Sequence, residues 1–357
     1  MAVIERLTLR RLRLPLTKPY RLSYRTFDEF EPYVVEAAAS GGATAFGDGH
    51  ISPGSSSETR EGGWAFLSER LPQAIGRETG EAKDLFLRDF EQSKVAATAA
   101  VSALEALERN PLLEIKEETV LPLLTPIGAQ DQAGVEAEVE EALALGFRTF
   151  KIKVGKDVDA DLERLGWIQR ATAGRASFRV DANRAYDRDA AIRFATSLEP
   201  DGVELFEQPC DADDWDANAA VAAVSRVPLM LDEPICTLAD IERAAGLKGV
   251  GFCKVKLKRF GGLDRLAAGI AHIQAHGMGA VLGDGLGSEI QSWLEACVAA
   301  PSIRNAGEFN GFLKPVERLF SNPLPFENGA VRLRAGYWPE LDRGKLEAAT
   351  LEKRDFA

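Results

Sequence analysis

The sequence predicts an α/β protein in which a small α+β unit precedes a (β/α)8-type barrel, and three observations lead to this prediction. Residues 1–118 contain strand patterns followed by helix patterns, an order typical of an α+β unit. From residue 119 onward, short apolar strands alternate with amphipathic helices, as they do in a barrel. Charged residues close successive strands at intervals of 24 to 28 residues (153 to 181, 181 to 207, 207 to 232, 232 to 256).

The N-terminal unit begins with strands and continues with helices. Residues 3–36 alternate and are rich in β-branched and aromatic residues, with breaks at Pro15 and Pro19, which predicts two or three strands with long turns. Residues 49–63 are rich in Gly, Ser and charge and predict a mobile loop. Residues 64–110 carry apolar side chains at helical spacing and predict helices.

The second part of the chain predicts eight strands with helices in most of the intervals. Helices are expected, for example, at 135–145, 160–173 and 263–276. An open doubly wound sheet is the alternative, but it usually carries a Gly-rich dinucleotide turn after an early strand. The clearest glycine cluster comes late, and Ser288 stands where that turn needs its last Gly. The strands are expected at 120–124, 148–154, 177–182, 202–207, 228–232, 251–257, 279–284 and 305–310.

Composition limits the partners and the location of the protein. The 357 residues include 43 Lys and Arg against 55 Asp and Glu, a formal net charge of −12. Such an acidic excess repels nucleic acid and anionic membrane, so neither is an expected partner. No apolar run approaches the roughly 18 residues of a membrane helix, and the charged N-terminus does not resemble an export signal. The four widely spaced Cys residues are typical of reduced thiols. We therefore expect a cytoplasmic protein.

Three carboxylates end neighbouring predicted strands. Asp181, Glu207 and Asp232 each follow an apolar strand, and active sites of barrels assemble at the C-terminal ends of the strands. Left unpaired inside a barrel, these charges would be costly. A hard cation would resolve the cost, and carboxylate oxygens suit Mg²⁺ best. The alternative is an internal salt-bridge network with Lys153 and Lys256.

Two lysines bracket this carboxylate ring. Lys153 lies one strand before Asp181, and Lys256 lies one strand after Asp232. Because side chains alternate along a strand, Lys151 and Lys153 share one face, and their apolar neighbours Ile152 and Val154 suit the helix layer. A dication beside a lysine lowers the lysine pKa towards the range of a base. Two such bases could move a proton between the faces of a planar enediolate, or one could deprotonate the substrate before an elimination.

Taken together, the strand-end motifs resemble the enolase superfamily, and within it the mandelate racemase and muconate lactonizing enzyme family, two-lysine muconate-lactonizing type. The resemblance covers nearly the whole chain. It is carried by K-x-K (Lys151, Lys153), D-x-N (Asp181, Asn183), E-Q-P (Glu207–Pro209), D-E (Asp232, Glu233) and K-x-K-x-x-x-x-G-G (Lys254–Gly262).

The resemblance implies a fold and a set of roles. The fold would be a modified TIM barrel, (β/α)7β, over 119–315, with an α+β capping domain at 1–118 and a C-terminal segment, 316–357, that packs back on the cap. By resemblance, Mg²⁺ is bound by Asp181, Glu207 and Asp232. Lys153 and Lys256 form the acid/base pair, and Lys151 assists the substrate carboxylate. The resemblance also suggests a homo-oligomer.

Departures from the family concern the substrate. Dipeptide epimerases carry Asp-x-Asp at strand eight to hold an ammonium group, whereas this chain has Glu308 and Asn310. Asp284 at the end of strand seven could bind an amine or a hydroxyl, or could cap the following helix. The loop with Tyr20, Ser23 and Tyr24 and the loop around His50 occupy places where the family closes over its substrate. We expect substrate contacts from Asn183, Asp284, Glu308, Tyr20 and His50.

The sequence therefore predicts Mg²⁺-dependent removal of the α-proton of a small, perhaps amino-acid-like, carboxylate, followed by racemisation, epimerisation or dehydration. Cycloisomerisation is an alternative in the same site. A metal-independent lyase with Lys256 as a Schiff-base nucleophile and a non-catalytic binding protein are the other two classes. Trapping a borohydride adduct would favour the lyase, whereas the complete set of lysines and carboxylates argues against a non-catalytic barrel.

Overall fold

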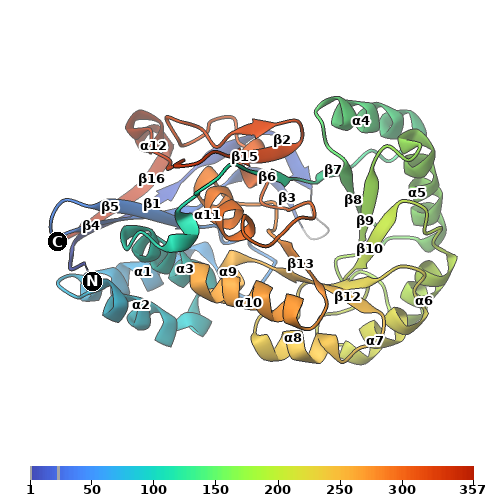
Figure 1. The fold of residues 1–357 in the computed structure, drawn as a ribbon, viewed down its shortest axis with the longest axis horizontal. Coiled ribbons are helices and arrows are strands. Elements are labelled where there is room, and N and C mark those ends of the chain that lie inside the picture. Colours follow the sequence, from blue (N-terminus) through green and yellow to red (C-terminus); the bar gives the residue numbers. More distant parts are fainter. Residues whose placement is uncertain (1, 22–24) are drawn as a thin grey trace.

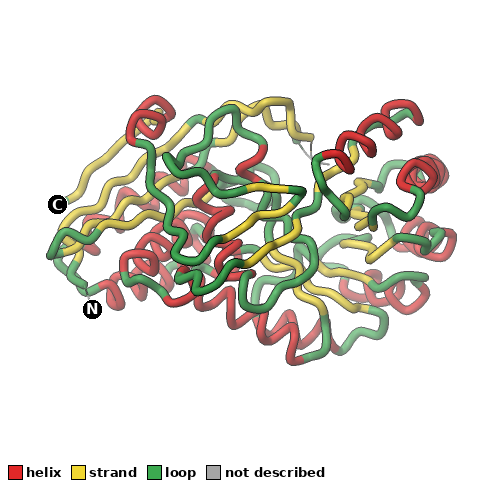
Figure 2. Tube along the Cα trace, turned by 45° about the horizontal axis from the view of Figure 1, so that its top comes forward, coloured by secondary structure: helices red, strands yellow, loops and turns green. Residues whose placement is uncertain are grey.

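The structure, a computed structural model, describes residues 2–21 and 25–357 of the chain. Strands and helices from both chain ends lie on the left in Figure 1, and parallel strands wrapped by helices lie on the right. Both termini lie on the left side, although the barrel separates them in sequence. In Figure 2 the helices of the barrel half are on the outside and its strands are inside. The structure thus confirms the predicted α/β class with a barrel.

The N-terminal unit is built on a four-stranded antiparallel sheet in the order β16-β1-β4-β5. Its central strand β1 (Ile4–Leu12) pairs with β4 (Tyr33–Ala39) and with β16 (Thr350–Phe356), the last strand of the chain. β5 (Thr44–Gly49) pairs with the other edge of β4. A separate hairpin, β2 (Leu14–Arg21) and β3 (Thr26–Phe30), leads towards the barrel.

Three helices accompany this sheet: α1 (Arg60–Ala74), α2 (Thr79–Arg88) and α3 (Lys94–Leu107). All residues of α3 after Lys94 are buried, because the helix runs between the sheet and the other helices. Glycine at Gly47 permits the contact of α3 with β5, since a Cβ there would lie 2.4 Å from the backbone nitrogen of Ala103. The expected loop at 49–63 is shorter, because α1 begins at Arg60.

The barrel contains seven parallel strands in sequential order, β7 to β13. Apolar side chains facing the outer helices are buried, as Ile152 and Val180 illustrate with no exposed surface. The sequential order places the C-terminal ends of neighbouring strands beside one another. The strands are β7 (Thr125–Ile127), β8 (Thr149–Lys153), β9 (Ser177–Asp181), β10 (Val203–Glu207), β11 (Leu229–Leu231), β12 (Val250–Val255) and β13 (Gly279–Leu282).

Local capping defines where the outer helices start. Four successive helices begin after an aspartate whose carboxylate accepts a hydrogen bond from the backbone N–H three residues later, at Asp131, Asp157, Asp187 and Asp214. The helices are α4 (Gln132–Ala144), α5 (Val158–Thr172), α6 (Arg188–Ser197), α7 (Trp215–Val224), α8 (Leu238–Ala245), α9 (Leu257–Phe260), α10 (Leu263–Ala275) and α11 (Glu289–Ala299).

Two strand predictions were wrong in detail. The strand predicted at 120–124 is observed as β6 (Thr119–Pro122), which pairs with β15 (Ala330–Leu333), and the first strand of the barrel sheet, β7, begins only at Thr125. The chain changes partner at this point, because the Leu124 N–H donates to Gly307. The segment predicted as strand eight, 305–310, is not a regular strand. It closes the barrel through isolated backbone hydrogen bonds. These include a parallel bridge between Leu123 and Gly307 and a 2.8 Å hydrogen bond from the Glu308 N–H to the Leu282 carbonyl.

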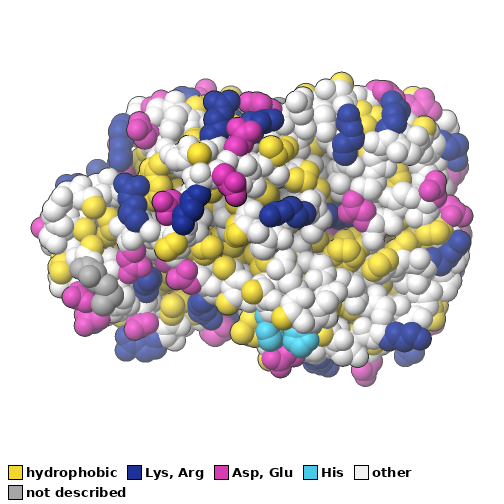
Figure 3. Space-filling view, in the orientation of Figure 1, with side chains coloured by type: hydrophobic (Ala, Val, Ile, Leu, Met, Phe, Trp, Pro, Cys, Tyr) yellow, Lys and Arg dark blue, Asp and Glu magenta, His cyan; other side chains and the backbone are white. Residues whose placement is uncertain are grey.

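The C-terminal segment returns along the barrel to the N-terminal unit. It contains β14 (Phe326–Glu327), β15, α12 (Arg343–Ala349) and β16. Helix α11 lies between the N-terminal unit and the barrel. All of its residues are buried, and Trp293 is at its centre. Among the described residues, no helix is long and apolar enough to cross a bilayer. Acidic and basic side chains are interspersed over the face shown in Figure 3.

Candidate active site

Three buried carboxylates meet at the C-terminal ends of adjacent barrel strands. Asp181 ends β9 and Glu207 ends β10, and the two residues pair directly across the sheet. Asp232 follows β11, the next strand. Asp181 and Glu207 have no exposed surface, and Asp232 is 2% exposed. The strand order therefore brings together the three residues that the sequence predicted as a ring.

The two lysines of β8 contact this ring from one side. The Lys151 ammonium lies 2.8 Å from Asp181 Oδ2, 2.9 Å from Glu207 Oε2 and 2.7 Å from Glu308 Oε1. Lys153 Nζ lies 2.5 Å from Asp181 Oδ2 and donates a hydrogen bond to the side chain of Asn183. Both lysines thus face into the barrel, as the alternation along β8 predicts.

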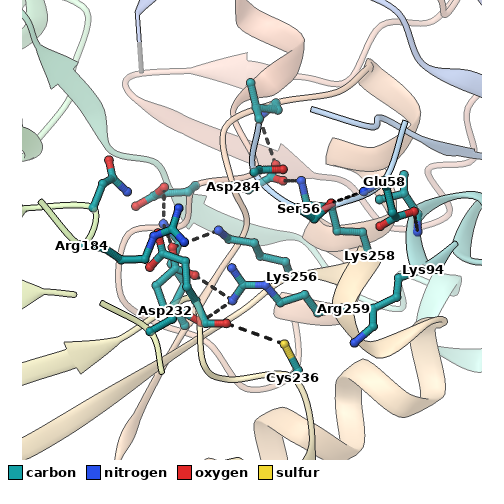
Figure 4. A pocket seen from close by; sticks show the side chains of 18 of the residues that line it. Ser56, Glu58, Lys94, Arg184, Asp232, Cys236, Lys256, Lys258, Arg259 and Asp284 are labelled. Carbon is teal, nitrogen blue, oxygen red and sulfur yellow. Dashed lines mark hydrogen bonds and ion pairs between the residues drawn. The ribbon is translucent and has the colours of Figure 1, made fainter. Parts of the chain in front are cut away.

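The lysines at the end of β12 contact the ring from the opposite side. Lys254 Nζ lies 3.0 Å from Glu207 Oε1 and 2.7 Å from Glu308 Oε2. Lys256 Nζ lies 3.0 Å from Asp232 Oδ2. Figure 4 shows Lys256 and Arg259 both directed at Asp232, and Arg259 Nη1 donates to Asp232 Oδ1 at 2.9 Å. Three strands, β9 to β11, separate Lys153 from Lys256.

Burial and charge shift the pKa values of these groups in different directions. Burial, together with the neighbouring Asp181 charge, raises the pKa of Glu207 to about 7. Burial also disfavours the Asp181 charge, but Lys151 and Lys153 outweigh it and lower the Asp181 pKa. The pKa of Lys256 falls below its ordinary value, because burial and the Arg259 charge both disfavour the ammonium form. Such a shift moves a lysine towards the range of a general base.

The donor set suits a hard cation, although ammonium groups now lie among the carboxylates. Within the described residues, no group of three or more Asp, Glu, His or Cys side chains is arranged to take a metal ion directly. The reason is that Lys151 lies within 2.9 Å of both Asp181 and Glu207, so that its ammonium lies where the two carboxylates converge. Oxygen donors on three rigid strands nevertheless match the ligand chemistry of Mg²⁺, so the residues present fit this ion.

A cavity of about 540 Å³ opens above the ring, between the barrel and the N-terminal unit. Its volume is typical of a small-molecule site. The barrel contributes its lysines, Asn183, Asp284 and Glu308 to the lining, and the hairpin contributes Tyr20. Ser55–Glu58 and the start of α3 with Lys94 line the opposite side. Four of the five predicted substrate contacts therefore line this cavity.

His50 is the exception among the predicted substrate contacts. Its side chain is 1% exposed and packs between Phe27 and Phe30, with ring centroids 6.2 and 5.0 Å away. The expectation that His50 touches substrate was wrong, because β5 extends to Gly49 and turns the next residue into the core. Ser23 and Tyr24, which lie on the same loop as Tyr20 in sequence, are outside the described residues.

Asp284 does not cap the helix that follows it. Ser288 is the N-cap of α11 and accepts a hydrogen bond from the Ile290 N–H. Asp284 instead pairs with Lys258 at 2.5 Å and accepts a hydrogen bond from the Leu286 N–H. The Asp284–Lys258 pair faces the cavity, and the alternative in which Asp284 caps the helix is excluded.

Several cationic groups of the site were given no role from the sequence. Lys254 had no assigned role, and the structure gives it Glu207 and Glu308 as partners. Arg259 belongs to the same K-x-K segment, and it lies on the short helix α9, which places its guanidinium beside the Asp232 carboxylate. Its position three residues after Lys256 was the only available signal. Nothing in the pattern pointed to Lys314, which lies beyond the barrel closure.

Comparisons with known proteins agree with this architecture. Residues 134–337 match the family model described as "Enolase C-terminal domain-like". The chain is 33% identical over 261 residues to the L-Lys-D/L-Arg epimerase of Methylococcus capsulatus, covering 70% of this chain and 73% of that protein. It is 27% identical over 351 residues to muconate cycloisomerase 1 of Rhodococcus opacus, covering 91% of this chain and 92% of the relative.

Solved structures extend the likeness to the whole fold. A dipeptide epimerase from Cytophaga hutchinsonii, complexed with Mg and the dipeptide D-Ala-L-Val, superposes with a TM-score of 0.91 at 20% identity, covering 99% of this chain and 100% of the other. The chain belongs to the enolase superfamily, in its mandelate racemase and muconate lactonizing enzyme family. It is thus an enzyme of a class whose matched members include epimerases, racemases and cycloisomerases.

Proposed function

We propose that this enzyme removes the α-proton of a small carboxylate substrate and returns a proton to the opposite face, giving racemisation or epimerisation. The observation that carries this proposal is the placement of Lys153 and Lys256 on opposite sides of one carboxylate ring. In its neutral form one lysine takes the proton, and the C–H electron pair moves into the carboxylate to give an enediolate. The other lysine, as an ammonium, donates its proton to the α-carbon from the far side.

We infer that Asp181, Glu207 and Asp232 hold Mg²⁺, and their carboxylate chemistry supports this assignment. When bound, the ion would offset the negative charge that grows on the substrate carboxylate as the proton leaves. Lys151 would supply a further positive charge beside the same carboxylate.

The domain arrangement and the remaining contacts complete the proposal. We place the capping domain at 1–118, the barrel at 119–315 and the returning segment at 316–357. Asn183, Asp284, Glu308 and Tyr20 are the proposed substrate contacts, because each lines the cavity. The family resemblance suggests a homo-oligomer and the composition suggests the cytoplasm, and light scattering of the purified protein would test the oligomeric state.

Cycloisomerisation is a second candidate, because relatives of both kinds match nearly the whole chain. The likeness to a muconate cycloisomerase covers 91% of this chain at 27% identity, and the likeness to an aromatic dipeptide epimerase covers 91% at 28% identity. Both reactions share an enediolate and the same two lysines, so the site chemistry alone does not separate them. Products identified by NMR would separate them, since only epimerisation leaves the connectivity of the substrate unchanged.

A deuterium-exchange screen tests the proposal. Carboxylates incubated with enzyme and Mg²⁺ in D₂O should acquire α-deuterium, whatever product forms later, and EDTA should suppress the exchange. The library would contain dipeptides, N-acyl amino acids, proline derivatives and hydroxy acids. Exchange that persists in EDTA and is blocked by borohydride would instead indicate Schiff-base chemistry at Lys256. Absence of exchange in every substrate would refute the proposed reaction.

A further inference from the structure

Lys256, one of the two lysines of the proposed acid/base pair, lies outside the regular barrel sheet. Strand β12 ends at Val255, and Lys256 follows it in an extended conformation, directly before the short helix α9. Lys153, in contrast, lies within β8 and pairs with Asp181 of β9. The strand ladder therefore holds the backbone of one lysine but not of the other. Other contacts must fix the direction of the Lys256 side chain.

The peptide group between Lys256 and Leu257 is held at both of its polar atoms. The Lys256 carbonyl accepts a hydrogen bond from the Arg259 N–H at 3.0 Å. On the other side, the Leu257 N–H donates to Glu295 Oε1 of α11 at 3.2 Å. The Lys256 side chain does not cap α9, so Glu295 supplies the acceptor for the first N–H of this helix. Because the peptide group is planar, these two bonds together set the direction in which the Lys256 side chain leaves the backbone.

Glu295 is a buried acid without a cation to balance it. Its side chain is 1% exposed, and no lysine or arginine in the described part of the chain forms an ion pair with it. The cations of the neighbouring segment pair elsewhere, Lys258 with Asp284 and Arg259 with Asp232. Burial and the Asp284 charge raise the pKa of Glu295 to about 8, so the group is mainly protonated at neutral pH. What this side chain contributes is thus an acceptor oxygen for a buried backbone N–H.

The helix that carries Glu295 is fixed independently of Lys256. At the start of α11, Ser288 Oγ donates to Asp48 Oδ2 of β5, in the N-terminal unit, at 2.5 Å. Glu289 of the same helix accepts hydrogen bonds from two backbone N–H groups of the returning segment, at 3.0 and 2.8 Å. The N-terminal unit and the returning segment therefore hold α11 in place, and Glu295 transmits this fixed position to the backbone at Lys256.

We propose that Glu295 is a positioning residue for Lys256 and, through the Leu257 N–H, directs this lysine at one face of the substrate. This inference rests on the proposed function. The ion pair with Asp232 does not fix the direction of Lys256 by itself, because the lysine stem is flexible. Lys153 faces the other side of the substrate and does not depend on Glu295. Loss of the Glu295 oxygen should therefore impair the reaction at one face only.

Separate measurement of the two faces tests this inference. A carboxylate that exchanges in the deuterium screen is offered as its pure L and pure D epimers, with Mg²⁺ in D₂O. Each epimer presents its α-hydrogen to one lysine, which takes the proton as ND₂H⁺ and can return a deuteron to the same face. In Glu295→Leu, exchange from one epimer should fall about 10²-fold, the effect of a displaced catalytic group, and exchange from the other should change by less than about threefold. Epimerisation in both directions should fall through kcat and not through KM, because each direction needs both lysines.

Three further variants separate positioning from a general loss of packing. Glu295→Gln keeps an oxygen acceptor and should restore exchange at the weakened face to within about fivefold of the wild type. The matched control is Glu105→Leu, since Glu105 is also a buried acid and accepts a hydrogen bond from the Leu263 N–H at the start of α10. This control should keep the wild-type ratio of the two exchange rates. If Glu295→Leu does not fold, Glu295→Asp withdraws the oxygen by one methylene group and should weaken the same face.

Backbone hydrogen exchange distinguishes a failure of this inference from a failure of the proposed function, because it needs no substrate. In Glu295→Leu the segment 254–260 should exchange at least about tenfold faster than in the wild type, whereas Glu105→Leu should leave it protected. Unchanged protection of this segment, or equal losses of exchange at the two faces, would overturn the inference and leave the proposed function intact. A wild-type enzyme that exchanges neither epimer, or only one, would refute the two-lysine reaction itself and this inference with it.

Discussion

Glu105 connects the N-terminal unit to the barrel, and its pKa gives a measurable consequence. This residue of α3 accepts hydrogen bonds from the first two N–H groups of α10, Leu263 at 2.7 Å and Asp264 at 3.3 Å. Gly262 allows this approach, since a Cβ there would lie 3.0 Å from both carboxylate oxygens. The side chain is 3% exposed, and burial raises its pKa from 4.5 to about 7 despite the two donors.

The sign and size of the effect follow from this shift. A carboxyl group with a raised pKa in the folded state holds its proton more tightly than in the unfolded chain. Its contribution to stability is therefore complete below pH 4.5 and disappears as the pH rises through about 7. A shift of about 2.5 pKa units corresponds to about 3 kcal/mol at most. Glu105→Gln stays neutral at every pH and lacks this dependence.

Urea unfolding at several pH values measures the effect. The free energy of unfolding of the wild type minus that of Glu105→Gln should fall by up to about 3 kcal/mol between pH 4.5 and 8.5. The exposed Glu163→Gln on α5 is the matched control and should follow the wild type at each pH. A difference that stays constant, or that grows with pH, would refute the reasoning. If this difference in the free energy of unfolding grew with pH, the N-terminus of α10 would stabilise the charged Glu105 carboxylate more than burial disfavours it.

Three further predictions concern the reaction. Lys153→Ala and Lys256→Ala should each lose about 10²–10⁴ in turnover while keeping their Mg²⁺ affinity, and near-normal turnover in either variant would contradict two-base catalysis. Asp181→Asn should weaken Mg²⁺ binding in calorimetric titrations, and an unchanged affinity would remove Asp181 from the ligand set. Arg259→Met removes a positive charge that, after burial, lowers the pKa of Lys256. The acidic limb of its pH–rate profile should therefore move to higher pH, and a limb that stays in place would show that Arg259 does not tune Lys256.

The ring of charged residues was predictable, because parallel strands carry their C-terminal residues to one edge. The spacing of Asp181, Glu207 and Asp232 matches one strand and one helix, so their meeting depends only on strand order. The ion pairs of Lys153 with Asp181 and of Lys256 with Asp232 match the salt-bridge alternative drawn from the sequence, but the partners of Lys151 and Lys254 were not predictable. Lys151 and Lys254 share Glu308, which comes from the irregular closing segment, and that contact exists only once the barrel is closed.

His50, which was misplaced, and Lys314, which was missed, share a different cause. His50 looked accessible because glycine and serine surround it in the sequence, but its position after β5 turns it into the aromatic core. Lys314 gave no signal, because its ammonium contacts Tyr20, a residue nearly 300 positions earlier in the chain. Contacts between segments so far apart are set by the tertiary fold and leave no local periodicity to read.

The pairing of β16 with β1 has a consequence for synthesis of the protein. The register joins Leu7 to Phe356 and Leu12 to Thr350, so β1 is synthesised long before the strand that pairs with it. During elongation the outer edge of β1 has no partner, and exposed edges invite pairing with other chains. The barrel strands meanwhile emerge in their spatial order and can associate sequentially. The N-terminal sheet is thus complete only after residues 350–356 have been synthesised, and a chain interrupted before them would keep an open edge on β1.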